Sequence, residues 1–122
     1  AMVARAYSII GSGYRYTGYV WTGSPSTSAF TCSGVVDFAL GLGSNSNSPA
    51  SLLSQVKARG GFVSSASQLQ YGDLAFYSSG GRISHVGIYI GGGNVIDSIP
   101  GGGVGIRSVT YVNGFIGGGR II

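Results

Sequence analysis

Glutamate is absent from this chain of 122 residues, and the other residues that commonly bind metal ions are scarce. There are three Asp, one His and one Cys, spread along the chain. A structural zinc site takes four such ligands, and a calcium loop needs several carboxylates close together in the sequence. A single Cys also excludes an internal disulfide. We therefore expect no bound metal ion.

Charge is scarce as well, since Lys and Arg total seven and the net charge is +4. The basic residues are scattered, and none of them forms the stripe typical of a nucleic-acid-binding protein. A weakly basic surface could help the domain approach an anionic polymer, or it could serve solubility alone. The chain also lacks a phosphate-binding glycine motif and any apolar run long enough to span a membrane. We expect no cofactor, no nucleic acid and no membrane insertion.

Glycine is abundant at 24 residues, whereas proline occurs only three times. No repeating triplet accompanies the glycine, which excludes a collagen-like chain. Hydrophobic residues make up 43% of the sequence, so disorder is not expected. The length fits one compact domain, and we expect residues 1–122 to form a single, monomeric domain. We expect turns at the three triple glycines, which occupy 91–93, 101–103 and 117–119.

The pattern of apolar residues changes from a helical period to a strand period along the chain. Three helices are expected in the first half, over residues 2–10, 31–40 and 49–59, with a structured loop over 11–30. Thr31 and Ser48 are the expected N-caps, and Pro49 suits the first helical turn. Short strands are expected in the second half, over 74–77, 84–90, 95–99, 104–109 and 114–122. This order predicts an α+β fold with N-terminal helices packed on a small antiparallel sheet.

Cys32 and His85 are the first candidates for chemistry. Cys32 begins the second expected helix, where the helix dipole favours a thiolate, although a buried and inert Cys is the alternative. His85 lies near the start of the strand over 84–90, and Gly87 shares its face of the sheet. The missing side chain at Gly87 would leave room for a helix end beside the imidazole. A thiolate next to an imidazole can attack a carbonyl group.

A catalytic base also needs a partner that orients its ring, and Asp97 is the best candidate. It lies 12 residues after His85, on the next strand of a hairpin. The two side chains share a face only if the connecting loop has an odd length or a bulge, which the glycines at 91–93 allow. Asp37 lies inside the helix that carries Cys32, and Asp73 fits a turn better.

Five segments, in order, resemble the NlpC-type cell-wall peptidases, a papain-like bacterial family. They cover nearly the whole chain and read Tyr19-Val20-Trp21-Thr22-Gly23, Phe30-Thr31-Cys32-Ser33-Gly34-Val35-Val36, Gly72-Asp73-Leu74-Ala75-Phe76, Ser84-His85-Val86-Gly87-Ile88-Tyr89-Ile90 and Val95-Ile96-Asp97. The resemblance implies a nucleophile at Cys32, a general base and acid at His85, and an orienting residue at Asp97. The third residue is commonly His in the family, so Asp is a less usual choice.

The resemblance also implies substrate-binding residues. Spacing to the nucleophile favours Tyr19 as the active-site tyrosine, and Tyr14 is a second candidate. Ser33 is kept from the family pattern, whereas Thr31 stands where an Asp is usual. That Asp and the following Ser help to bind the substrate's polar main chain or free amine in relatives, so Thr31 places recognition of an amine in question.

The implied function is a cysteine endopeptidase that hydrolyses peptidoglycan stem peptides between D-glutamate, or a related residue, and a diamino acid. The chain opens directly with Ala-Met and a helical pattern, without a signal peptide, so we expect a domain cut from a longer protein. The resemblance implies that this protein is secreted and located at the bacterial cell wall. Two alternatives remain open at this stage. One is a non-catalytic wall-binding module on the same scaffold, and the other is an amidase or acyl transferase that uses the same residues.

Overall fold

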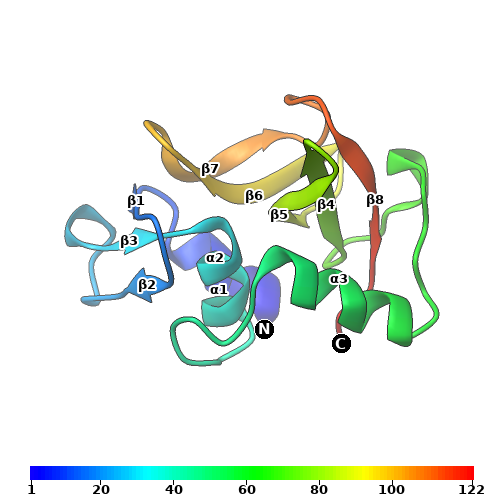
Figure 1. Ribbon diagram of the computed structural model, residues 1–122. Helices are drawn as coiled ribbons and strands as arrows, with labels where there is room; N and C mark the ends of the chain where they lie inside the picture. The colour runs from blue at the N-terminus through cyan, green and yellow to red at the C-terminus, as the bar shows by residue number, and fades with distance from the viewer.

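Three helices lie beneath a five-stranded antiparallel sheet, and a small three-stranded sheet flanks them (Figure 1). This arrangement comes from a computed structural model that describes residues 1–122. The helices are α1 (Met2–Ser8), α2 (Cys32–Ala39) and α3 (Pro49–Ala58). The larger sheet has the strand order β7-β6-β5-β4-β8, with β4 (Leu74–Ser79), β5 (Arg82–Tyr89), β6 (Asn94–Ile99), β7 (Gly103–Ser108) and β8 (Phe115–Gly119).

The two longer helices begin close to the predicted positions, but only one has a side-chain cap. Ser48 accepts a hydrogen bond from the Ser51 amide and forms a reciprocal capping box, with Pro49 in the first turn of α3. Thr31 is the N-cap of α2, yet its side chain makes no capping hydrogen bond, so the predicted side-chain cap is wrong. The Thr31 amide donates instead to the carbonyl of Gly18 in the preceding segment.

The segment over 11–30, predicted as a loop, contains three strands of two residues each. They are β1 (Gly13–Tyr14), β2 (Tyr19–Val20) and β3 (Ala29–Phe30), and β3 pairs with β1 in parallel and with β2 antiparallel. Strands this short cannot show the alternation of apolar and polar residues by which a strand is recognised in sequence. The chain also contains two short 3-10 helices, η1 (Pro25–Thr27) and η2 (Ala66–Gln68).

The hairpin between β5 and β6 has the odd loop that the sequence analysis required. Ile88 pairs with Ile96, and Tyr89 pairs with Val95. The Ile90 amide donates to the carbonyl of Asn94, which leaves the glycines at 91–93 as a three-residue turn. All three of these glycines have positive φ, a conformation that costs glycine little. This register places residues 85 and 97 on the same face of the sheet.

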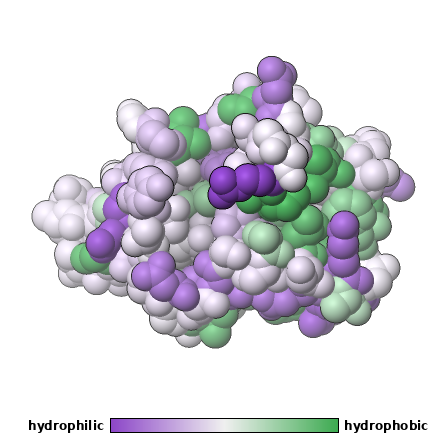
Figure 2. All heavy atoms as spheres, viewed as in Figure 1, coloured by the Kyte–Doolittle hydropathy of each residue, from purple (hydrophilic) through white to green (hydrophobic).

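Apolar side chains pack on both faces of the larger sheet. The main core joins α1, α2 and α3 to one face of the sheet, where Val86 and Ile88 are completely buried. A smaller cluster covers the other face and contains Ala75, Tyr77 and Val95. Figure 2 shows that hydrophobic surface gathers above α3, beside β4, β5 and β8, while most of this view is polar or neutral. None of the helices has the length and apolar character needed to cross a membrane.

The glycines at 117–119 lie within strand β8, so the predicted turn at this position is wrong. Three carbonyl groups explain why glycine is needed here. A Cβ added to Gly117 would lie 2.3 Å from the Val63 carbonyl oxygen, and one added to Gly118 would lie 1.9 Å from that of Leu74. A Cβ on Gly119 would lie 2.6 Å from the carbonyl oxygen of Gly61. The strand is therefore wedged between β4 and the segment that follows α3.

We expect Gly118→Ala to lower the free energy of unfolding by about 1–3 kcal/mol, because the added methyl group would displace the backbone of β4. Chemical denaturation of both proteins measures the change. Gly43→Ala is the matched control, since Gly43 has open space around its Cα and no positive φ. Equal losses of stability in the two variants would contradict the close approach at Gly118.

Candidate active site

Cys32 is the first residue of α2 and is 8% exposed. Gly34, two residues after Cys32, is explained by packing against the connection between β1 and β2. A Cβ on Gly34 would lie 2.4 Å from the carbonyl oxygen of Gly18, the same oxygen that accepts from the Thr31 amide at 2.9 Å. Glycine at position 34 therefore lets this connection approach the start of α2 and form one border of the cleft around Cys32.

His85 lies on β5, and its imidazole is largely buried with 17% of the side chain exposed. Its Nε2 is 2.7 Å from Oδ2 of Asp97, and its ring lies 5.3 Å from that of Tyr77. The predicted role of Gly87 is wrong. A Cβ there would meet Val95 at 3.2 Å and the Cβ of Asp97 at 3.4 Å, so β6 and not a helix end occupies the space. Glycine at this position brings Asp97 close to β5.

Asp97 is completely buried on β6 and accepts hydrogen bonds from three side chains. Besides His85, the Tyr111 hydroxyl donates to Oδ2 at 2.7 Å and Arg107 Nη1 donates to Oδ1 at 2.7 Å. Sequence reasoning missed Arg107 and Tyr111. The signal that could have found Arg107 is its place on the next strand, two residues after Gly105, which pairs with Asp97. No comparable signal marks Tyr111, which follows β7 in a turn.

The pKa values of this group reflect competition between burial and hydrogen bonds. Burial alone would raise the pKa of Asp97, but hydrogen bonds from His85, Tyr111 and Arg107 hold it below its ordinary value of 3.8. Burial would lower the pKa of His85, while Asp97 and Cys32 together raise it from 6.5 to about 9. These shifts favour an imidazolium beside Cys32 and a carboxylate behind it at neutral pH.

The same shifts make protein stability depend on pH. The pKa of His85 is raised on folding, so its contribution is complete below pH 6.5 and is lost as the pH rises through about 9. The pKa of Asp97 is lowered on folding, so its contribution is present above 3.8 and is lost as the pH falls through the folded value. We expect the free energy of unfolding to decrease between pH 6.5 and 9. Urea denaturation across this range should show the decrease in the wild type and a weaker one in His85→Gln.

The cleft that holds Cys32 and His85 has a volume of about 690 Å³, and its lining includes residues of α2, the start of α3 and β5. Figure 1 shows where these three elements lie. The cleft lining is mostly hydroxyl, amide and aromatic groups. Among the lining residues there is one Arg, Arg82, and one His, His85, and there is no Lys, Asp or Glu. The lining residues are Tyr14, Tyr16, Thr17, Gly18, Thr31, Cys32, Ser33, Asn45, Asn47, Ser48, Pro49, Arg82, Ser84, His85, Ser98 and Pro100.

Of the two candidate tyrosines, Tyr14 lines this cleft and Tyr19 does not. The Tyr19 hydroxyl donates to the carbonyl of Leu42 at 2.7 Å, and its ring packs against Phe30 and Phe38. The preference for Tyr19 from sequence spacing therefore does not agree with its position. Thr31 and Ser33 both line the cleft, and their role in substrate binding stays a prediction.

Asp37 supports one wall of the cleft without entering it. Its carboxylate is completely buried and accepts hydrogen bonds from the amide and the side chain of Asn47, at 3.1 and 2.9 Å. The Asn47 side-chain oxygen in turn accepts from Ser51 and Gln55 on α3. This network fixes the loop between α2 and α3, in which Asn45, Asn47 and Ser48 border the cleft.

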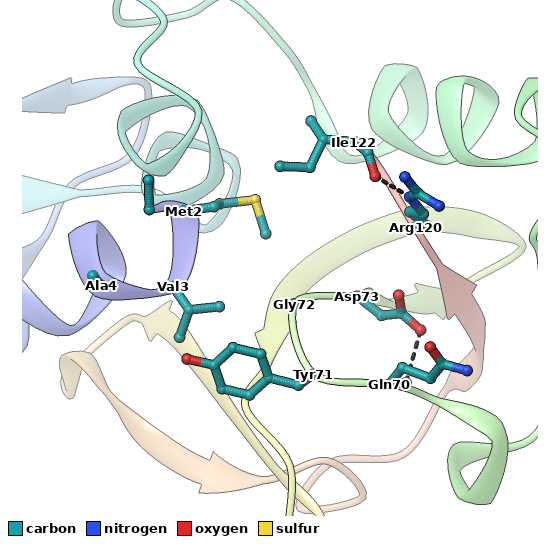
Figure 3. Close-up of a pocket in the computed structure, with 10 residues that line it drawn as sticks. Met2, Val3, Ala4, Gln70, Tyr71, Gly72, Asp73, Arg120 and Ile122 are labelled. Atoms are coloured by element: carbon teal, nitrogen blue, oxygen red, sulfur yellow. Dashed lines mark hydrogen bonds between the residues drawn. The ribbon is translucent and has the colours of Figure 1, made fainter.

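A second hollow of about 420 Å³ lies between α1, the turn over 70–73 and the end of the chain (Figure 3). Two of its polar side chains make local contacts. Asp73 accepts from the Gln70 amide at 2.8 Å, and Arg120 donates to the carbonyl of Ile122. Neither the sole thiol nor the sole imidazole lines it. No group of three or more His, Cys, Asp or Glu side chains is placed to hold a metal ion anywhere in the chain.

Solved structures of peptidoglycan hydrolases resemble this fold. The chain is 30% identical to the NlpC/p60 domain of the peptidoglycan hydrolase SagA, with a TM-score of 0.68 over 98% of this chain and 96% of that one. It is 26% identical to the peptidoglycan hydrolase RipB of Mycobacterium tuberculosis, with a TM-score of 0.73 over 99% of this chain and 63% of that one. These neighbours confirm the predicted α+β, papain-like fold.

Curated relatives match in sequence over most of the chain. A probable endopeptidase p60 of Listeria grayi is 38% identical over 84% of this chain, and protein P54 of Enterococcus faecium is 37% identical over 91%. The chain spans only 20% of the length of each. The model of the NlpC/P60 family matches residues 16–114, which include Cys32, His85 and Asp97. The chain therefore belongs to the NlpC/P60 family.

Proposed function

We propose that this domain is a cysteine peptidase that hydrolyses peptidoglycan stem peptides, with Cys32 as nucleophile, His85 as base and acid, and Asp97 as the orienting residue. The observation that carries the proposal is the 2.7 Å contact between His85 and the buried carboxylate of Asp97, at the cleft that also holds the only thiol. Family membership and the peptidoglycan hydrolases among the structural neighbours support the substrate class.

The proposed reaction has two steps. The Cys32 thiolate attacks the carbonyl carbon of the scissile amide, the C–N bond breaks, and His85 gives its proton to the departing amine. Water then attacks the thioester while His85 takes a proton, the C–S bond breaks, and the thiolate returns. Backbone N–H groups at the start of α2, including that of Cys32, would hold the negative oxygen in each step. Asp97 keeps the His85 ring oriented throughout.

The family resemblance suggests that the bond joins D-glutamate, or a related residue, to a diamino acid. We propose further that the domain is the catalytic part of a longer secreted protein that acts at the bacterial cell wall. The two alternatives use the same scaffold differently. A wall-binding module would bind peptidoglycan without releasing fragments, and an amidase or acyl transferase would release different products.

Alkylation of the single Cys tests whether the proposed pair functions, with no need to know the substrate. At about pH 6 we expect iodoacetamide to modify Cys32 at least about tenfold faster in the wild type than in His85→Gln, because the proposed base beside the thiol can take up its proton during the reaction. Mass spectrometry of the intact protein measures the rate. Equal rates in the two proteins would contradict the pairing and would favour the wall-binding module.

The charge of the cleft also leads to an expectation about the substrate. Thr31 stands where the family pattern usually has Asp, and the cleft lining contains no carboxylate, so a substrate ammonium group would find no anionic partner. Arg82 is exposed at the cleft and is free of salt bridges. We therefore expect the enzyme to accept stem peptides whose amino terminus is acylated, and to prefer those with a free carboxylate near Arg82.

Arg82→Gln should raise the KM for a carboxylate-bearing stem peptide by about threefold to fivefold, the size expected for an exposed ion pair. The KM for the same peptide with that carboxylate amidated should not change. Arg59→Gln is the matched control, because Arg59 is an exposed residue that follows α3 and does not line the cleft. An equal response of both peptides to Arg82→Gln would argue against this carboxylate contact.

A further inference from the structure

We propose that Arg107 and Tyr111 are positioning residues. They allow an Asp, Asp97, to serve as the third residue of this site, the one that orients His85. Arg107 holds the oxygen of the Asp97 carboxylate that does not contact His85, and it offsets the charge of Asp97. Tyr111 donates to the same oxygen that contacts His85. The proposal rests on the proposed function, because it concerns how Asp97 acts on the proposed base. It assigns a role to two residues that do not line the cleft and that the sequence analysis did not select.

The two oxygens of Asp97 are divided among three donors. Oδ1 accepts from Arg107 Nη1 at 2.7 Å, and Oδ2 accepts from Tyr111 at 2.7 Å and lies 2.7 Å from His85 Nε2. The Tyr111 hydroxyl also lies 3.3 Å from His85 Nε2. Because both oxygens are occupied, the carboxylate cannot rotate about its Cβ–Cγ bond without losing a charge-assisted hydrogen bond. The direction in which Oδ2 faces the imidazole is therefore fixed.

Backbone and side-chain contacts hold Arg107 and Tyr111 in place. Arg107 lies on β7, where Gly105 pairs with Asp97, and its guanidinium group passes beside Gly105 to reach Asp97. The same guanidinium nitrogen also donates to the backbone carbonyl of Asp97 at 3.1 Å. Tyr111 follows Val109, whose amide donates to the Gly93 carbonyl at 2.8 Å and whose carbonyl accepts from the buried Tyr77 hydroxyl. Arg107 and the segment that carries Tyr111 are thus both anchored to the larger sheet.

Charge gives Arg107 a second effect. A buried carboxylate next to an imidazole holds the proton on the ring strongly, and a neutral third residue such as His or Asn would not do so to the same extent. Arg107 places one positive charge against Asp97, which reduces its pull on that proton. The other groups that face His85 are Cys32 from α2, Tyr77 from β4 and Tyr111 after β7. Arg82, on β5 itself, borders the same cleft.

Titration of His85 by NMR tests the proposal directly, because the chain contains only one His and its ring signals need no assignment. In Arg107→Gln we expect the His85 pKa to rise by about one unit, since the carboxylate is left without its compensating cation. We expect kcat on peptidoglycan to fall about tenfold or more with little change in KM. Arg107→Lys should restore the pKa and only part of kcat, because Lys supplies the charge without the planar donor geometry.

Tyr111→Phe is the second variant, since it keeps the ring and removes only the hydroxyl group. We expect kcat to fall with KM unchanged, even if Arg107→Gln folds poorly. Arg59→Gln, which removes a distant exposed Arg, should leave both kcat and the His85 titration unchanged. Arg107→Gln and Tyr111→Phe proteins that lose stability but keep the wild-type His85 titration and kcat would overturn the proposal.

The His85 titration of the wild type shows whether a failure concerns the positioning role of Arg107 and Tyr111 or the proposed function itself. If His85 titrates in the wild type at its ordinary value, and Cys32→Ala does not change that titration, then the Cys32–His85 pair itself fails. If the wild-type His85 pKa is raised and responds to Cys32→Ala, but not to Arg107→Gln or Tyr111→Phe, only the positioning role fails.

Discussion

Cys32→Ala should abolish the release of peptides from peptidoglycan, with a loss of about 10⁴-fold or more in kcat. The chain has no second thiol that could replace the nucleophile. The loss should occur without unfolding, because alanine suits a helix and the side chain that is removed is small. Turnover is measured from soluble fragments, and folding is measured by circular dichroism and thermal denaturation.

Ser54→Ala is the matched control for this substitution, because Ser54 is an exposed residue of α3 and does not line the cleft. We expect its activity and stability to match those of the wild type. Wild-type turnover in Cys32→Ala would rule out covalent catalysis by the thiol. Loss of structure in Cys32→Ala would make Cys32 a core residue, in line with the inert alternative.

Asp97→Asn should be nearly as damaging as loss of the nucleophile, although Asn has almost the same shape. Three side-chain donors meet the two oxygens of Asp97, and an amide offers only one acceptor oxygen. Its NH₂ group must therefore face Arg107, or else face Tyr111 and His85. We expect kcat to fall by about 10³- to 10⁴-fold, as when a triad carboxylate becomes an amide. Stability should fall by about 3 kcal/mol, because the charge of Arg107 loses its buried partner.

A double substitution distinguishes the charge effect from general disruption of the site. Asp97→Asn combined with Arg107→Gln removes both members of the ion pair, and it should recover part of the stability lost in Asp97→Asn alone. Denaturation of the two single variants and the double variant measures the coupling. Additive losses of stability would show that Asp97 and Arg107 do not interact as their 2.7 Å contact indicates.

The hairpin that carries His85 and Asp97 could be predicted because its sequence is local and regular. Alternation of Val86 and Ile88 with His85 sets the faces of β5, and the three glycines at 91–93 set the odd loop. The order of helices and strands followed from the change in apolar period. These features depend on residues that are close in the sequence, so the pattern alone is informative.

Contacts between distant segments could not be predicted in the same way. Arg107 and Tyr111 reach Asp97 because β7 returns beside β6, and the register of that pairing decides which residues meet the carboxylate. Tyr14 lines the cleft and Tyr19 does not, because β3 separates the strands that carry them. The glycines at 117–119 were wrongly predicted to form a turn. The carbonyl groups that crowd β8 come from β4 and from residues 61–63, which are distant in the sequence.

Digestion of purified peptidoglycan, followed by mass spectrometry of the soluble fragments, tests the central proposal most directly. With the wild-type protein we expect fragments that carry a new free carboxyl group on a D-glutamyl or related residue and a new free amine on the diamino acid. Cys32→Ala, incubated in parallel, should release none of them. Fragments cut within the glycan strands, cleavage that persists in Cys32→Ala, or binding of the wild type to peptidoglycan without release of peptides would contradict a stem-peptide hydrolase that depends on Cys32.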